Sequence, residues 1–365
     1  MVSAKDLKSF RISSSIDTLS NEGRKMASLV PSETLLILVR GMSLFKSIPL
    51  GIATQELAIN QDLKGLIAKG NVSASFLAYS LLARENALLQ MVEAAGHGTG
   101  RLDTDALKDF MVRVPPREEQ EGIVDVLATW DTAIERTEQL IAAKEDRFLA
   151  LIDRLVLKPA SGKAWKTQKL RDIATRVQRR SDGGGHPVLT ISNASGFVLQ
   201  EEKYKRYMAG ESVKDYILLR RGEFAYNKGN SLRFQFGCVY QLHTYDEAIV
   251  PHVYVCFRLH DDISSSYLRH LFAVDYLKPQ LGKLVKTGIR NNGLLNIRPD
   301  EFLGVTVPIP PLERQHRIAE ILDAARSEID LLKRQADAYR TQKRALMQKL
   351  LTGQWRVKVP EEANK

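Results

Sequence analysis

The sequence predicts an α+β protein in which two mixed α/β domains are separated by two long helices that form an antiparallel coiled coil. The main observation is a repeated motif: Pro-Pro-Arg-Glu-Glu-Gln from Pro115 to Gln120, and Pro-Pro-Leu-Glu-Arg-Gln from Pro310 to Gln315. The offset is 195 residues (310 minus 115), and both copies continue into a regular apolar stripe. This period is too long for a solenoid repeat, so it indicates one domain and one long helix used twice.

The apolar stripe after each motif has the spacing of a coiled coil, with steps of three and four residues over about five heptads. Proline is tolerated in the first turn of a helix and disfavours helix before it, so each helix is expected to begin near its Pro-Pro pair. The residues predicted to pack in the spacer helices are Ile123, Leu127, Trp130, Ile134, Ile141, Phe148, Leu151 and Leu155 in the first, and Ile318, Leu322, Ile329, Leu332, Tyr339, Leu346 and Leu350 in the second.

Two helices with one apolar stripe each are expected to pack on each other. A helix of about 35–40 residues spans roughly 50–60 Å. Residues 165–300 can return the chain between the two helices, which favours an antiparallel pair within one chain. A parallel pair in a homodimer is the competing arrangement.

The duplication extends into the globular domains. Phe76 to Leu82 parallels Tyr267 to Ala273, and each run is expected to form a helix after a serine-rich turn. Trp165-Lys166-Thr167-Gln168-Lys169-Leu170 opens the second domain and has no counterpart in the first, which is expected to be shorter at its N-terminal side by about two dozen residues. The expected boundaries are 1–113 for the first domain, 114–160 for the first spacer helix, 161–308 for the second domain, 309–355 for the second spacer helix and 356–365 for a C-terminal tail.

Composition argues against several classes of protein. No run of about 18 apolar residues and no N-terminal apolar segment occur, so neither a membrane span nor a secretory signal is expected. The two cysteines lack CxxC spacing, which favours reduced thiols and a cytoplasmic location. The histidines lack metal-ligand spacing, and there is no P-loop and no amino-methyltransferase motif at the Pro-Pro pairs. We therefore expect a noncatalytic chain without a metal.

The charge distribution favours a polyanionic partner. The formal net charge is +10, and residues 165–300 alone carry 21 basic and 13 acidic side chains. Such an excess on one domain indicates nucleic acid, with a merely basic surface as the alternative. Lysine and arginine near glycine suit phosphate contacts, and asparagine can read adenine edges. The candidate DNA-binding residues are Arg179, Arg180, Lys203, Lys205, Arg206, Lys228, Asn230, Ser231, Arg233, Lys286, Arg290, Asn291 and Asn292 in the second domain, and Arg40, Ser43, Lys46, His97 and Arg101 in the first.

The order of these motifs resembles the specificity subunit of type I restriction–modification systems. The resemblance rests on two variable domains, each followed by Pro-Pro-x-x-x-Gln and a long helix, with Leu350-Leu351-Thr352-Gly353 closing the second. It implies that each domain is a target recognition domain reading half of a bipartite sequence in double-stranded DNA. It also implies that the helices set the spacing of the half-sites and dock two methyltransferase subunits, to which restriction subunits are added, in defence against phage.

The resemblance further implies that this subunit carries no chemistry and binds no cofactor. S-adenosylmethionine, ATP and Mg would be bound by the partner subunits. Two alternatives stay open: a specificity subunit of a methylation-only complex, and a coiled-coil scaffold that binds no DNA.

Overall fold

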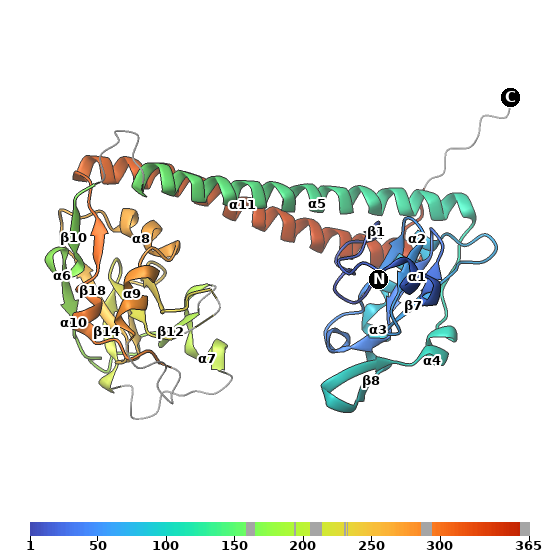
Figure 1. Cartoon of the computed structure of the whole chain (residues 1–365), viewed down its shortest axis with the longest axis horizontal. Coiled ribbons are helices and arrows are strands. Elements are labelled where there is room, and N and C mark those ends of the chain that lie inside the picture. The colour runs from blue at the N-terminus through green and yellow to red at the C-terminus, as the bar shows by residue number, and fades with distance from the viewer. Residues whose placement is uncertain are drawn as a thin grey trace. The chain divides into compact units, whose positions relative to one another are not determined.

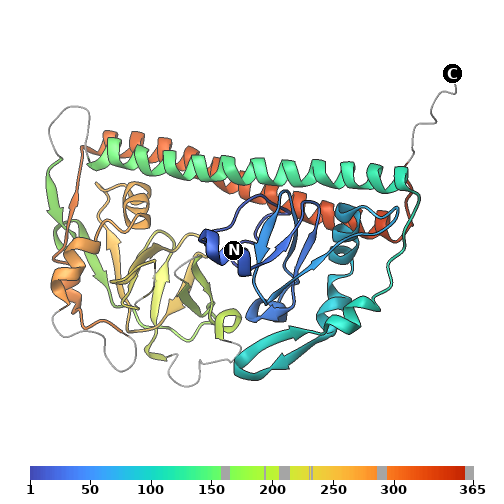
Figure 2. The same ribbon diagram turned by 45° about the vertical axis from the view of Figure 1, so that its right-hand side comes forward.

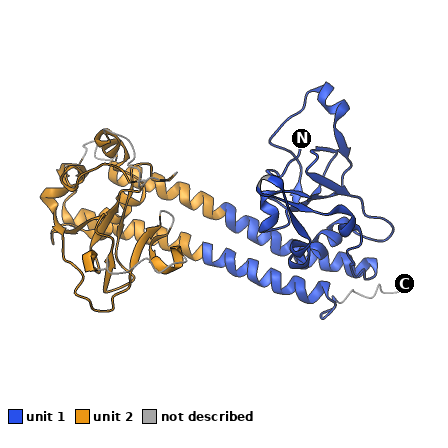
Figure 3. Ribbon diagram, turned by 90° about the horizontal axis from the view of Figure 1, so that it is seen from below, with its two compact units in different colours: residues 1–139, 333–365 blue, residues 140–332 orange. Residues whose placement is uncertain are grey.

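The computed structural model describes residues 1–157, 165–192, 195–204, 214–229, 231, 233–285 and 294–357. They form two compact units: unit 1 is residues 1–139 with 333–365, and unit 2 is residues 140–332 (Figure 3). The long helices α5 (Arg117–Ile152) and α11 (Leu312–Leu351) each contribute one part to both units. The predicted fold class is confirmed: mixed helix and strand, with two long antiparallel helices.

Unit 1 is built on a four-stranded sheet of order β1-β5-β3-β7. Its central strand β3 reads Leu-Leu-Ile-Leu and is buried throughout, as a continuous apolar run covered on both faces should be. The other elements are α1 (Asn21–Met26), α2 (Ala74–Ala83), α3 (Glu85–Gln90), α4 (Thr104–Lys108), and the strands β1 (Arg11–Ile12), β2 (Ser28–Val30), β3 (Leu35–Leu38), β4 (Arg40–Gly41), β5 (Leu50–Ala53), β6 (Leu57–Ile59), β7 (Leu63–Leu66), β8 (Val92–Ala95) and β9 (Thr99–Leu102).

Unit 2 is built on a four-stranded sheet of order β11-β18-β15-β16. A separate ribbon pairs β10 with β19, next to the Pro-Pro pair. The elements are β10 (Thr167–Lys169), α6 (Leu170–Ile173), β11 (Ala174–Val177), β12 (Leu189–Ser192), β13 (Gly196–Leu199), α7 (Gln200–Tyr204), β14 (Ile217–Arg220), β15 (Phe224–Asn227), β16 (Cys238–Gln241), β17 (Glu247–Val250), β18 (Val255–Leu259), α8 (Ser265–Ala273), α9 (Lys278–Leu284), α10 (Pro299–Phe302) and β19 (Thr306–Pro308).

Helices α2 and α8 occupy the same place in the two units and begin in the same way. The Ser73 hydroxyl accepts a hydrogen bond from the Phe76 amide, and the Ser264 hydroxyl accepts one from the Tyr267 amide. Serine at this position satisfies one of the free amides of the first turn. The helices expected after serine-rich turns are thus present, and each carries a buried aromatic side chain at the position of that amide.

The glutamine of the repeated motif explains why the motif occurs in front of each long helix. Gln120 accepts a hydrogen bond from the Ser73 amide at 2.9 Å and donates to the Asn71 and Pro115 carbonyls at 3.0 and 2.8 Å. Gln315 accepts from the Ser264 amide at 2.8 Å and donates to the Pro310 carbonyl at 2.8 Å. Both side chains are buried. Each glutamine therefore fastens the first turn of a long helix to the start of the short helix beneath it.

Helices α5 and α11 lie side by side within each unit, and their sequences run in opposite directions (Figures 1 and 2). In unit 1, Asp131 bonds Lys343 and Glu138 bonds Arg340, while Trp130 meets Tyr339 edge to face at 5.7 Å. In unit 2, Lys144 pairs with Glu328, and the Arg326 guanidinium lies 4.2 Å from the centre of the Phe148 ring. Residues later in α5 contact residues earlier in α11, so the two helices are antiparallel.

The predicted seam residues are all buried or half-buried, although the seam shifts near the end of the first helix. Ile152 and Val156 are more deeply buried there than Leu151 and Leu155. Residues Asp153–Leu157, which follow Ile152, form a π-helical turn with more residues per turn than an α-helix. In the described part of the chain, no helix combines the length and apolar character needed to cross a bilayer.

Candidate nucleic-acid interface

In unit 1, the structure brings two of the predicted residues together on a small sheet. Arg40 of β4 lies directly opposite Arg101 of β9, and both side chains are exposed. Arg101 also faces Glu93 of β8, whereas Arg40 forms no ion pair among the described residues. Like charges opposite each other are unfavourable in a sheet unless an anion lies over them. The pair therefore marks a surface suited to phosphate.

The turn that follows β4 widens this surface. Ser43 and Lys46 are exposed, in and directly after the 3₁₀ turn Met42–Phe45. Two apolar side chains that the sequence did not single out are exposed beside them, Met42 at 72% and Phe45 at 50%. Cationic side chains interleaved with apolar ones are typical of surfaces that bind nucleic acid. His97 lies in the nearby turn Gly96–Gly98, and its side chain falls outside the described residues.

Unit 2 has the same construction at the corresponding place. An isolated bridge joins Gly229 to Leu294, and the Leu295 amide donates to the Lys228 carbonyl at 3.1 Å. This bridge corresponds to the pairing of Gly41 with Gly100 in unit 1. The candidate segment that starts at Lys228 therefore begins beside Leu294 and Leu295. Asn230, Lys286, Arg290, Asn291 and Asn292 themselves lie outside the described residues, as do Lys205 and Arg206.

The described residues of the first segment form a tight turn. The Ser231 hydroxyl accepts from the Phe234 amide at 3.0 Å, and the Ser231 amide donates to the Phe234 carbonyl. The Arg233 guanidinium lies 5.2 Å from the centre of the Phe234 ring. Arg233 also lines a cavity of about 420 Å³ with Glu145, Asp275 and Arg326. The Ser231 hydroxyl is therefore used to stabilise the turn, while the Arg233 side chain is exposed to solvent.

Three other predicted cations are already engaged within unit 2. Arg179 donates to both oxygens of the buried Glu223 carboxylate at 2.8 and 3.3 Å, and to the Leu218 carbonyl. Arg180 is exposed and pairs with Asp215 at 3.5 Å. Lys203 donates to the Ile191 carbonyl at 2.8 Å. Arg179 thus neutralises a buried acid, and this role leaves it the least suited of the three to bind phosphate.

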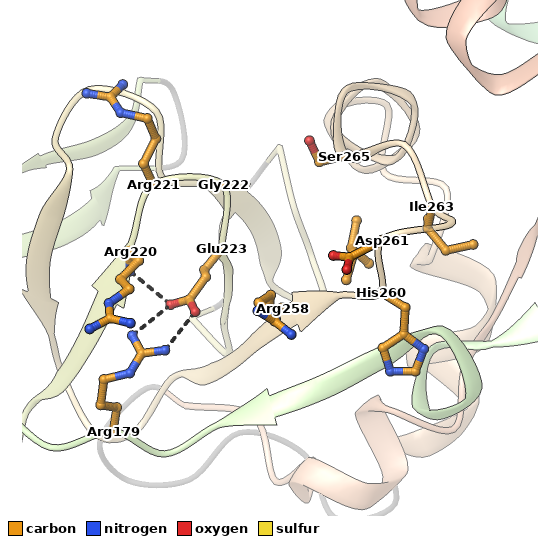
Figure 4. Close-up of a pocket in the computed structure, with 11 residues that line it drawn as sticks. Arg179, Arg220, Arg221, Gly222, Glu223, Arg258, His260, Asp261, Ile263 and Ser265 are labelled. Carbon is orange, nitrogen blue, oxygen red and sulfur yellow. Dashed lines mark hydrogen bonds and ion pairs between the residues drawn. The ribbon is translucent and has the colours of Figure 1, made fainter. Parts of the chain in front are cut away.

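An arginine-lined basin of about 450 Å³ in unit 2 includes Arg258, which the sequence analysis did not single out (Figure 4). Arg220 bonds Glu247 at 3.0 Å and Arg221 bonds Asp246 at 2.7 Å, so both are paired. Arg258 projects into the basin from β18 and is exposed, without an ion pair among the described residues (Figure 4). A sequence signal existed, because Arg258 interrupts an otherwise apolar strand and must therefore lie on its exposed side.

Both cysteines of the chain lie buried in unit 2. Burial raises the pKa of the Cys238 thiol to about 12 and also raises that of Cys256, so neither is a nucleophile at neutral pH. Within the described ranges, no three His, Cys, Asp or Glu side chains gather closely enough to hold a metal ion. The arrangement is suited to binding an anion, with backbone turns and cations at two equivalent places.

Comparison with known proteins gives one consistent family. A family model described as the type I restriction modification DNA specificity domain matches residues 3–144 and 163–338. The chain is 24% identical over 314 residues to the MjaVIII specificity subunit of Methanocaldococcus jannaschii, covering 78% of this chain and 70% of that protein. It is 27% identical over 133 residues to the EcoR124I/EcoR124II specificity subunit of Escherichia coli, covering 36% of this chain and 33% of that protein. The match to the first of these relatives is thus long, and the match to the second spans a third of that subunit.

The fold is similar to that of a solved structure of the same class. The S subunit of a type I restriction-modification system from M. genitalium aligns with a TM-score of 0.54 at 14% identity, covering 96% of this chain and 91% of that one. At this identity, the likeness concerns the fold alone. The family model, which matches most of the length in two consecutive copies, decides the assignment: the chain belongs to the type I restriction modification DNA specificity domain family.

Proposed function

We propose that this chain is the noncatalytic subunit that reads a bipartite target in double-stranded DNA and docks methyltransferase subunits. The observation that carries the proposal is the equivalence of two surfaces. Arg40 in unit 1 comes after strand β3, and Lys228 in unit 2 comes directly after the corresponding strand β15. Arg40 pairs with Arg101 of β9, and the residue after Lys228 bridges to Leu294. One such surface in each of two similar units suits a target with two unlike halves, because their side chains differ.

The long helices support the docking part of the proposal. On α5 and α11, four apolar side chains of unit 2 are exposed by 44 to 58%: Leu140, Leu149, Ile321 and Leu331. Exposed apolar side chains on a helix of this length suit burial against partner helices. We propose that the chain itself binds no cofactor, and that S-adenosylmethionine, ATP and Mg belong to the methyltransferase and restriction partners. A cytoplasmic location follows from this role.

The decisive experiment maps methylated positions in DNA from cells with and without this gene. We expect a two-part motif that disappears with the gene, and that loses one half only when residues 165–300 are exchanged for those of a relative. A motif unaffected by deletion would contradict the proposal. ATP-dependent cleavage of unmethylated target by the purified complex separates a restriction system from a methylation-only complex.

A binding measurement tests the surface on unit 1 directly. Replacing Arg40 and Arg101 by glutamine should reduce the slope of log affinity against log salt by about 0.9 for each phosphate that is no longer neutralised, measured with the assembled methyltransferase complex. Lys5→Gln with Lys25→Gln removes the same charge from exposed positions elsewhere in unit 1 and should leave the slope nearly unchanged. Equal slopes in both double variants would exclude this surface. Absence of salt-dependent DNA retention, even with the methyltransferase supplied, would favour the scaffold alternative.

A further inference from the structure

The 3₁₀ turn Met42–Phe45 of unit 1 has three distinct sides, because side chains three residues apart in such a turn lie one above the other. Leu44 takes the inner side and is fully buried. Met42 and Phe45 are three residues apart and share a second side, where they are 72% and 50% exposed. Ser43 is exposed on the third side. The turn therefore presents a short apolar ridge, formed by Met42 and Phe45, next to a polar side.

The backbone that carries this ridge is held in place by its neighbours. The Lys46 amide donates to the Ser43 carbonyl at 2.9 Å and closes the turn. The Ile48 amide donates to the Glu85 carboxylate at 2.8 Å, which fastens the chain after the turn to α3. A Cβ added to Gly100 of β9 would lie 3.0 Å from the buried side chain of the turn, so glycine permits this close packing. The ridge is thus fixed before it meets a ligand, which lowers the entropic cost of binding.

Cations border the ridge on both sides along the chain. Arg40, two residues before Met42, is exposed and lies opposite Arg101 of β9. Lys46 directly follows Phe45 and is also exposed. Two copies of this chain that met through their ridges would bring these like charges together, which is unfavourable. A polyanion that carries apolar groups between its phosphates matches both the charge of the border and the apolar character of the ridge.

Thymine is the part of a DNA duplex that fits the ridge. Its C5 methyl group is the apolar group that base edges present in the major groove, and apolar side chains such as phenylalanine contact it there. Building on the proposed function, we infer that Met42 and Phe45 recognise thymine methyl groups in the half-site read by unit 1. Arg40 and Arg101 then neutralise phosphates beside the contacted bases and fix the register of the turn on the duplex.

Unit 2 exposes a different kind of group in the turn after β15. The aromatic ring there, Phe234, is only 2% exposed, and the residue in front of it, Arg233, is exposed instead. A guanidinium can donate two hydrogen bonds to the O6 and N7 atoms of guanine, whereas Met42 and Phe45 have no side-chain donor for a base edge. The affinity for the half-site of unit 1 is therefore expected to depend on the thymine methyl group.

Removing the methyl group alone tests this inference. In a duplex that bears the mapped two-part target, deoxyuridine replaces thymidine in the half-site that stays the same when residues 165–300 are exchanged. Deoxyuridine still pairs with adenine and lacks only the C5 methyl group. Burial of one group of this size corresponds to about fourfold in affinity, so the assembled methyltransferase complex should bind about fourfold more weakly for each methyl group that is contacted. Unchanged affinity would overturn the inference, as would a half-site without thymine.

A double-mutant cycle assigns the lost affinity to the ridge. In a complex with Met42→Ser and Phe45→Ser, the loss caused by deoxyuridine should fall below about twofold, because the methyl group then has no apolar partner to lose. The salt dependence of binding should stay that of the wild type, because no charge is removed. Ile16→Ser with Met26→Ser removes two exposed apolar side chains elsewhere in unit 1 and should keep the full loss. A full loss in the Met42 and Phe45 variant would mean that another group reads the methyl.

Failure of this inference can be told apart from failure of the proposed function. A two-part motif and salt-dependent binding, both unaffected by deoxyuridine, would keep the proposed function and remove the thymine contact. Affinity lost with Met42→Ser and Phe45→Ser but not with deoxyuridine would indicate insertion of the ridge between base steps, which also contradicts thymine reading. A complex that retains no DNA would contradict the inference and the proposed function together.

Discussion

Unit 1 and unit 2 follow one plan, but they differ where the short helix meets the long ones. In unit 1, the Tyr79 hydroxyl donates to Asp131 of α5 at 2.7 Å. In unit 2, the corresponding position is His270, whose ring nitrogen lies 2.6 Å from Asp323 of α11. Both contacts fasten a short helix to a long one through a carboxylate. The duplicated fold therefore keeps the mechanical connection, while the groups that make it, and their response to pH, have diverged.

Gln120 and Gln315 make the same contact in both units, and their replacement is expected to have the largest effect on the free energy of unfolding. Replacing Gln315 by leucine leaves the Ser264 amide and the Pro310 carbonyl buried without partners, which should lower the free energy of unfolding by about 2–5 kcal/mol. Gln120→Leu removes three hydrogen bonds whose partners are only partly buried, so water can replace some of them and the loss should be smaller, about 1–3 kcal/mol. Urea unfolding of each variant measures the loss, and amide exchange in α2 and α8 localises it to the unit concerned.

Gln335→Leu is the matched control for both variants. Gln335 is exposed on α11, and its hydrogen bond goes to Tyr339 one turn further along the same helix. Its replacement should change stability by less than about 0.5 kcal/mol, as for most exposed positions. A comparable loss in all three variants would mean that the motif glutamines do not fasten the helices in the way described.

The pH response should separate the two units at an intermediate level. Burial, with the nearby charges of Arg269 and Arg326, lowers the pKa of His270 below its usual 6.5 despite the Asp323 carboxylate beside it. The unfolded chain then takes up the proton first, so the stability contributed by neutral His270 is present above about pH 6.5 and is lost as the pH falls. The pKa of Asp323 is lowered by its hydrogen bonds, so that pair also weakens in acid.

His270→Asn removes the titrating group and should flatten the fall in stability between pH 7 and pH 5, measured by thermal unfolding. Unit 1 offers the internal reference, because burial and Asp131 raise the pKa of Tyr79 and keep it neutral throughout this range. Tyr79→Phe should therefore shift the melting temperature by the same amount at both pH values. An identical pH slope in wild type and His270→Asn would contradict the assignment to His270.

The regular parts of this fold could be predicted from the sequence because their signals are local. The heptad spacing predicts both long helices, and Ser73 and Ser264 predict the starts of helices α2 and α8 because serine is a favoured N-cap. The π-helical turn after Ile152 could not be predicted, because it reflects how the helix end packs rather than its own propensity. The hydrogen-bond partners of Gln120 and Gln315 could not be predicted either, because Ser73 and Ser264 are distant in the sequence and meet the glutamines only in the folded chain. The repeated motif itself can be found in the sequence.

The candidate site was predicted less evenly than the fold. Charge and glycine content single out residues that the structure brings together, since Arg40 lies opposite Arg101 and the Lys228 carbonyl accepts from the Leu295 amide. That these residues bind DNA stays a prediction. Charge and glycine content do not show which cations are already neutralised, because Arg179 and Glu223 are 44 residues apart and meet only in the folded sheet. The place of Arg258 in an apolar strand predicts that its side chain is exposed, but not the basin around it, because the other arginines that line the basin are distant in the sequence.

The smallest expected effect tests whether Thr34, directly before β3 in unit 1, carries an unsatisfied hydroxyl. Thr34→Val keeps the shape of the side chain and removes a buried hydroxyl without a partner, so it should stabilise the isolated chain by about 1 kcal/mol. Thr190→Val in unit 2 is the matched control, because the buried Thr190 hydroxyl lies 3.1 Å from the Tyr254 hydroxyl and bonds to it. The same substitution there should destabilise the chain by about 1 kcal/mol.

The opposite signs make this pair of variants informative, although each change is small. A chain destabilised by both substitutions, in urea unfolding at fixed pH, would show that the Thr34 hydroxyl has a partner after all. Stabilisation by Thr34→Val alone would show that this buried hydroxyl is kept at a cost to stability. Buried polar groups without partners are tolerated where another function requires them, and the two units provide the comparison within a single polypeptide.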